Sequence, residues 1–158
     1  KETEGTGGLR LGAATGAVAG LVAITPAAGF VGPMGSIAVG IGAGVLTFYA
    51  VRIRHKFGFD DALEVAAVHG VGGVWGAIAT GIFAVGGIGL VDGETEALVT
   101  NVIAVLATIA YSFIVTFVIL KILDVIPGLG LRADETEEDT GLDIALHGER
   151  AYVGDGAD

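Results

Sequence analysis

The stretch VAAVHGVGGVWGAIATGIFAVGGIGLV, which runs from Val65 to Val91, decides the fold. None of its 27 residues is Asp, Glu, Lys or Arg, and about 20 apolar residues are enough to cross the hydrocarbon of a bilayer. His69 is the one side chain in the stretch that ionises near neutral pH. An imidazole inside a membrane is costly to bury, so it needs a hydrogen-bond partner or a role in a transport pathway. The glycines that follow His69 leave room for other groups to approach it.

The remaining composition is that of a membrane protein. The chain is 53% hydrophobic, has a mean hydropathy of +0.76 and only 16% charged residues, whereas about a quarter of the residues of a soluble domain are charged. The sequence therefore predicts an all-α polytopic transmembrane helix bundle, surrounded by lipid in the cell membrane. Because there is no cysteine, disulfides and cysteine-ligated metals are excluded. We expect no cofactor, no metal site and no enzymatic activity, and we expect the chain to begin inside a longer protein.

Four apolar segments can be separated by their breaks. The uncharged run 11–51 is too long for one span, and Gly29-Phe30-Val31-Gly32-Pro33 is a turn sequence that divides it. We expect spans at about 11–31, 34–51, 62–85 and 97–124, which makes 1–133 a transmembrane bundle. Residues 134–158 hold nine acidic residues and form an acidic cytoplasmic C-terminal tail.

The positive charges predict the orientation. All eight Lys and Arg fall on the side of the four spans that both ends of the chain share. The two opposite loops, near Gly32 and over 86–96, contain none. The positive-inside rule then places both ends, including the C-terminus, in the cytoplasm.

Glycines recur at four-residue spacing in three of the spans, a pattern that lets membrane helices approach closely. It predicts a compact bundle and comprises Gly12, Gly16, Gly20, Gly40, Gly44, Gly72 and Gly76.

His69 has two interpretations. It is either a structural histidine bonded to a neighbouring helix, or a pore-lining imidazole kept neutral because burial disfavours the charged form. Thr25 precedes Pro26, which breaks the helix and leaves a carbonyl that could meet a cation. Asp60 or Asp61 is expected to cap a helix N-terminus, and Glu64 to interact with the dipole in its first turn.

The tail also has two interpretations. Its acidity is typical of a solvated, disordered segment, but Leu142, Ile144, Leu146 and Tyr152 are more apolar than such a segment needs. We therefore expect it to dock on a partner.

Several motifs together resemble the ammonium transporter (Amt/Mep/Rh) family. They are the stretch 16–29, Asp60-Asp61, the stretch 68–73, and the tail segments Gly141-Leu142-Asp143, His147-Gly148-Glu149 and Ala151-Tyr152. The resemblance implies eleven membrane helices with an inverted repeat, of which this chain would be helices eight to eleven plus the tail.

The resemblance also implies roles for single residues. His69 matches the second of two pore histidines, Thr25 a position near the outer vestibule, and Asp61 a capping carboxylate. Position 64 is Glu where many members have Asp. The tail would pack under a neighbouring subunit of a homotrimer and contact a PII-type signal-transduction protein through Gly141, Leu142, Asp143, His147, Gly148, Glu149 and Tyr152.

Transport of ammonium or ammonia through a narrow hydrophobic pore is the function that these features favour. A non-transporting, ammonium-sensing subunit that signals through its tail stays open as the alternative, and a generic proton channel as a third possibility. No feature indicates nucleic-acid binding.

Overall fold

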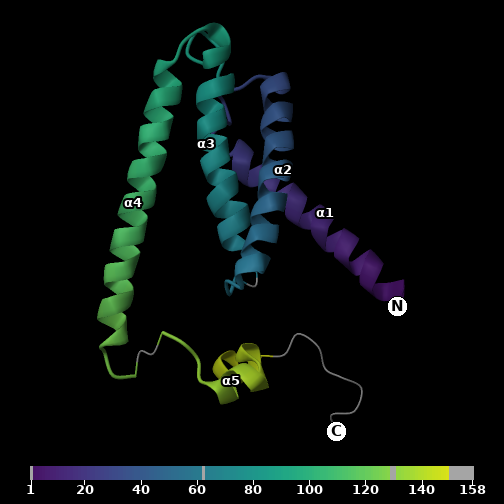
Figure 1. The fold of residues 1–158 in the computed structure, drawn as a ribbon, viewed down its shortest axis with the longest axis vertical. Coiled ribbons are helices and arrows are strands. Elements are labelled where there is room, and N and C mark those ends of the chain that lie inside the picture. The colour runs from purple at the N-terminus through teal and green to yellow at the C-terminus, as the bar shows by residue number, and fades with distance from the viewer. Residues whose placement is uncertain (1, 62, 129–130, 150–158) are drawn as a thin grey trace. The chain divides into compact units, whose positions relative to one another are not determined.

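The structure is a computed structural model that describes residues 2–61, 63–128 and 131–149 (Figure 1). Within these residues the regular structure is helical, apart from one isolated bridge between Val31 and Ala84, so the all-α prediction is confirmed. The elements are α1 (Glu2–Ile24), α2 (Pro33–Phe57), η1 (Ala66–Val71), α3 (Gly72–Phe83), η2 (Leu90–Asp92), α4 (Glu96–Asp124), α5 (Glu135–Thr140) and η3 (Asp143–His147). The chain divides into two units, Lys1–Ile109 and Ala110–Asp158.

Among the described residues, three helical segments are long and apolar enough to cross a membrane: Pro33–Phe57, Ala66–Phe83 and Glu96–Asp124. The apolar part of α1, Gly12–Ile24, is shorter. Because α1 was expected to continue to Val31, its end at Ile24 corrects the sequence prediction. The cause is Pro26, since the residue before a proline is disfavoured in a helix. A series of turns from Thr25 to Phe30 follows instead.

Both ends of α2 follow from local sequence. Pro33 is its first residue, where a proline costs no hydrogen bond. Gly58 ends it with a φ of 66°, a left-handed conformation that glycine adopts without a steric penalty. The helix therefore continues past the expected end at Val51 and includes the basic residues of the loop, as far as Phe57.

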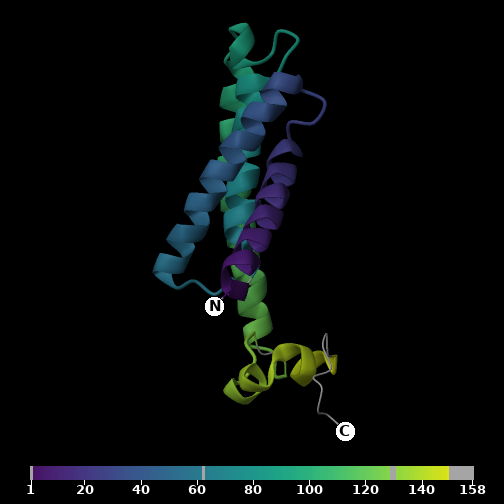
Figure 2. The ribbon, with the colours of Figure 1, turned by 90° about the vertical axis from the view of Figure 1, so that its right-hand side faces the viewer.

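In the first unit α1, α2 and α3 pack against one another (Figures 1 and 2). Their common core consists of small side chains, since Ala23, Val39, Ala43 and Ala79 are completely buried. Trp75 of α3 closes this core: its Nε1 donates a hydrogen bond of 2.9 Å to the carbonyl oxygen of Val39. Small residues at the contacts bring the three backbones close together, as is usual between membrane helices.

Only part of the predicted glycine pattern makes these contacts. A Cβ on Gly76 would overlap the backbone of Ala23, and one on Gly72 would touch Ala19 and Val22. The other five predicted glycines have no atom of the described residues within 4 Å of a Cβ added to them, so their expected packing role is not seen there: Gly12, Gly16, Gly20, Gly40 and Gly44. A Cβ on Gly42, which is outside the predicted pattern, would overlap the Trp75 ring.

The helix α4 touches α3 near its own start. Asn101 donates from its amide nitrogen to the carbonyl oxygen of Ala77 at 2.9 Å, and a Cβ on Gly81 would overlap the backbone of Leu98. No residue of α4 is buried within this chain. A mostly apolar helix with no buried residue has faces available for lipid or for other helices.

The second unit contains two short helical elements after α4. Asp134 and Glu137 form a reciprocal capping box at the start of α5. Gly141 ends α5 with a φ of 94°, and Gly148 follows η3 with a φ of 66°. Local hydrogen bonds therefore give this acidic segment helical structure as far as His147.

Candidate functional site

His69 lies inside a π-helical turn, the element η1, which continues directly into α3. Its side chain is exposed, and within the described part of the chain no group hydrogen-bonds its imidazole. Single π-turns inside α-helices hold one extra residue and are frequent at functional sites. The ring is therefore free to meet groups that lie outside this chain.

Asp61 caps the start of this interrupted helix. Its two carboxylate oxygens accept hydrogen bonds from the backbone N–H groups of Val65 and Ala66, each at 2.8 Å. These N–H donors, that of Ala66 first, hold the pKa of Asp61 below its ordinary value, and Arg54 adds a smaller effect in the same direction. Burial opposes the lowering of the pKa, and its effect is larger than that of Arg54. Of the two candidate aspartates, Asp61 makes the capping bonds.

Glu64 differs from its prediction as a first-turn residue of the helix. It precedes the helix with a φ of 56°, and it is the one non-glycine residue with positive φ in the described part of the chain. Its carboxylate forms an ion pair with the guanidinium of Arg54, with an Nη2 to Oε1 distance of 2.6 Å. The expected dipole interaction is thus replaced by a bond to the end of α2. A non-glycine residue in this region is strained, and such strain concentrates at functional sites.

Arg54, near the end of α2, binds two residues of the loop between α2 and η1. Besides binding Glu64, it donates from Nη1 to the carbonyl oxygen of Phe59 at 2.6 Å. Both charged side chains of the pair are largely buried, with 14% and 18% of their surfaces exposed. His55 lies beside them, with its Nε2 3.1 Å from Oε1 of Glu64 and most of its ring in contact with solvent. Sequence reasoning missed this pair, because Arg54 and Glu64 are ten residues apart and meet only where the loop between them folds back on the end of α2.

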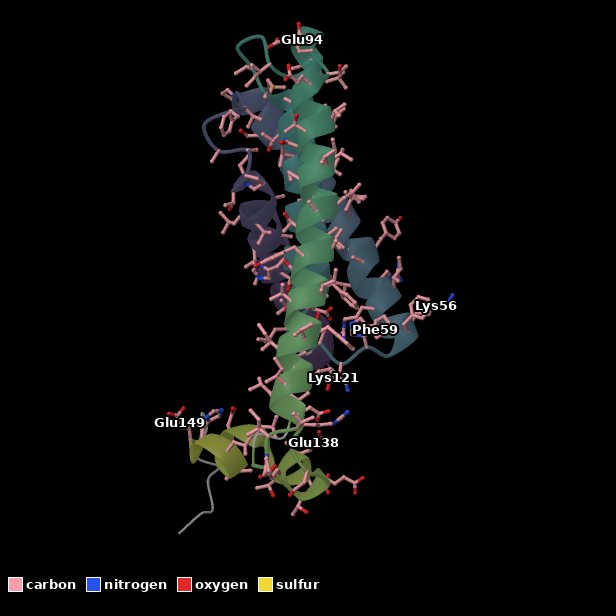
Figure 3. All side chains as sticks on the ribbon, turned by 90° about the vertical axis from the view of Figure 1, so that its left-hand side faces the viewer. Lys56, Phe59, Glu94, Lys121, Glu138 and Glu149 are labelled. Atoms are coloured by element: carbon pink, nitrogen blue, oxygen red, sulfur yellow. The ribbon has the colours of Figure 1, made fainter. Side chains whose placement is uncertain are left out.

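A cleft of about 340 Å³ opens beside this cluster, between α1 and α2. Gly16, Gly44 and Thr47 line its wall, and His55 and Glu64 line it as well. The small residues expected to form helix contacts thus border open space in this chain. Lys56 and Phe59 lie at this end of the first unit, and Glu94 lies at the opposite end (Figure 3).

Thr25 uses its hydroxyl at the end of α1, where Oγ1 donates to the carbonyl oxygen of Leu21 at 2.7 Å. Pro26 has no N–H to offer Val22, but the carbonyl oxygen of Val22 accepts from the N–H of Thr25 at 3.3 Å. The turn therefore satisfies the carbonyl that the sequence suggested as a cation ligand. The Thr25 oxygen, which is exposed, keeps its capacity to accept a hydrogen bond.

Most of the predicted docking residues of the tail lie in one short segment of the second unit. Leu142, Ile144 and Leu146 are 40–54% exposed. Asp143 and His147 bound η3, and Gly148 and Glu149 follow it. Tyr152 lies outside the described residues. The segment presents apolar side chains that nothing in its own unit buries.

The comparisons with known proteins agree with one another. The sequence profile of the Ammonium Transporter Family matches residues 9–152. The chain belongs to the ammonium transporter family. It is 51% identical over 149 residues to an ammonium transporter of Bacillus subtilis, covering 90% of this chain and 36% of that protein. It is 45% identical over 147 residues to ammonium transporter Amt1 of Archaeoglobus fulgidus, covering 90% and 37%.

Solved structures of the family have the same fold. Mep2 of Saccharomyces cerevisiae superimposes with a TM-score of 0.72 at 31% identity, over 77% of this chain and 30% of that one. Mep2 of Candida albicans gives 0.71 at 38% identity, over 78% and 29%. The chain thus spans about a third of the length of the relatives it matches, and it is a helical membrane segment of this family.

Proposed function

We propose that this chain forms part of a pore for ammonium or ammonia in a full-length membrane transporter. The observation that carries the proposal is the exposed imidazole of His69, held in a π-turn within an otherwise uncharged span. The names of the relatives support transport rather than sensing, since both the Bacillus and the Archaeoglobus proteins are called ammonium transporters.

The chemistry of a neutral imidazole suits this role. One ring nitrogen donates a hydrogen bond and the other accepts one, so the ring can hold a small polar molecule in place of water. The glycines beside it leave space, since Gly70 and Gly73 have no atom within 4 Å of an added Cβ. We propose that the ring shares a hydrogen bond with a second histidine from helices outside this chain, and that Thr25 lies near the outer vestibule.

The tail supplies the second part of the proposal. Its exposed apolar residues in 142–146 need a partner surface, and a neighbouring subunit of a homotrimer would supply one. We place the tail in the cytoplasm because the Lys and Arg residues fall on that side. There, Gly141 to Tyr152 would also contact a PII-type protein.

A transport assay tests the proposal. A full-length transporter that carries this segment is reconstituted in proteoliposomes, and ammonium uptake is followed together with the membrane current. We expect uptake well above that of protein-free vesicles. A correctly inserted protein with no uptake above this background would reject transport and favour the sensing alternative.

A further inference from the structure

The interrupted helix 66–83 is fixed at both ends by contacts that set its rotation. On the α3 side, Gly76 lies against the backbone of Ala23, and Trp75 donates to the carbonyl oxygen of Val39. These contacts hold α3 in the rotation seen here, because a Cβ at Gly76 would overlap Ala23 and Gly76 therefore allows the close approach. The face that α3 turns toward α1 is therefore determined by packing.

The other end is fixed by polar contacts. Asp61 bonds the first two free N–H groups of the helix. Arg54, from the end of α2, bonds both Glu64 and the carbonyl oxygen of Phe59, each at 2.6 Å. One side chain thus joins the end of α2 to the residue that enters η1. The left-handed backbone of Glu64 is sterically unfavourable, so it persists only while such contacts hold it.

The π-turn lies between these two fixed ends and holds the extra residue of the helix. A π-turn holds one residue more than an α-helical turn, and one residue corresponds to about 100° of rotation around a helix with 3.6 residues per turn. If the contacts before η1 loosen, the extra residue can move into the loop and the turn can become α-helical. His69 lies inside this turn, so its imidazole would rotate relative to the packed face of α3.

We propose that Arg54 is a positioning residue for transport: by holding Glu64 and the loop, it keeps the π-turn and therefore the direction of the His69 imidazole. This role rests on the proposed function of His69 in the pore. Among the described contacts, Arg54 touches no residue of the helix 66–83. It therefore acts on His69 through Glu64 and the backbone that follows it. The guanidinium suits the task because its planar fork binds two acceptors at once, which a lysine ammonium does less well.

The test compares Arg54→Gln, Arg54→Lys and Glu64→Gln in a full-length transporter in lipid. Lys121→Gln is the matched control, since it removes a lysine that forms an exposed pair with Asp124 at 3.6 Å. Two quantities are measured: ammonium uptake, and the ring ¹⁵N NMR signals of His69, which are identified by their loss in His69→Ala. Misplacement of a reacting group by about 1 Å can cost about 100-fold in rate.

We expect Arg54→Gln and Glu64→Gln to lower uptake by about tenfold or more and to shift the His69 ring signals. Arg54→Lys is expected to lie between them and the wild type, and Lys121→Gln to match the wild type. Unshifted His69 signals in Arg54→Gln and Glu64→Gln would overturn the positioning role, whatever their uptake. Wild-type uptake in His69→Ala would instead reject the proposed function, while a shifted ring in Arg54→Gln would still establish the structural link. If Arg54→Gln does not insert into the membrane, the His69 ring signals of the isosteric variant Glu64→Gln decide whether the positioning role holds.

Discussion

Replacing Gly76 by alanine tests the close packing of α1 and α3 most severely. The added methyl group would overlap the carbonyl oxygen of Ala23 and lie 2.9 Å from its Cα. These are backbone atoms, which have no alternative rotamer, so the helices must move apart. Overpacking costs about 1–3 kcal/mol, and we take about 3 kcal/mol because the obstacle is backbone. Alanine favours the helix over glycine by about 1 kcal/mol, which leaves a net loss of about 2 kcal/mol.

Gly73→Ala is the matched control, because it lies in the same helix and an added Cβ would meet no atom within 4 Å. It should leave stability unchanged or raise it by at most about 1 kcal/mol. The assay is SDS-induced unfolding of the 158-residue chain in detergent micelles, followed by helical circular dichroism. Equal unfolding midpoints for the two variants would refute the packing argument for Gly76.

Three further results are expected. The pKa of Asp61 is lowered in the folded protein, so its ionised form stabilises the fold at pH values above the ordinary pKa of 3.8. This stabilisation is lost as the pH falls through the lower pKa of the folded protein. The wild type should therefore lose more of its unfolding midpoint between pH 6 and pH 3 than Asp61→Asn, and equal losses would refute the capping role. Impermeant thiol reagents should label Glu94→Cys from outside intact cells but not Lys56→Cys, because these positions lie at opposite ends of the first unit (Figure 3); the reverse pattern would invert the topology. Deleting residues 141–152 should lower transport and weaken binding of a PII-type protein without preventing insertion, and unchanged values of both would return the tail to a solvated extension.

Uncharged runs were sufficient to predict the helical class and the general positions of the segments. Hydropathy reports how apolar a stretch is, so the run from Val65 to Val91 was visible without any contact information. Local stereochemistry supplied part of the detail: the turn sequence that ends in Pro33 was predicted, whereas the end of α2 at Phe57 was not, since the span was expected to end at Val51. Pro26 could have predicted the early end of α1 at Ile24. The residues after it are apolar as well, so the segment was interpreted as one continuous span.

The details of the site depend on contacts that a linear pattern does not contain. An α-turn and a π-turn of the same residues have the same hydropathy, so the π-turn at His69 could not be predicted. The pair of Arg54 and Glu64 is separated by ten residues and forms only because the loop folds back on the end of α2. Spacing by four residues indicated glycine contacts, but the partner helix decides which glycines make them, as Gly76 and Gly42 show.

The transport assay of His69→Ala tests the central proposal most directly. Thr80→Val is the control, since Thr80 lies in the same span and its buried hydroxyl donates only to its own helix, at Gly76. Both variants are made in a full-length transporter, and ammonium uptake and current are measured in proteoliposomes. We predict that His69→Ala lowers uptake or changes the charge selectivity, because a buried partner left without its hydrogen bond costs about 1–3 kcal/mol. Thr80→Val is expected to keep uptake and charge selectivity near those of the wild type. Wild-type uptake and selectivity in His69→Ala would contradict the pore assignment and leave His69 as a structural residue.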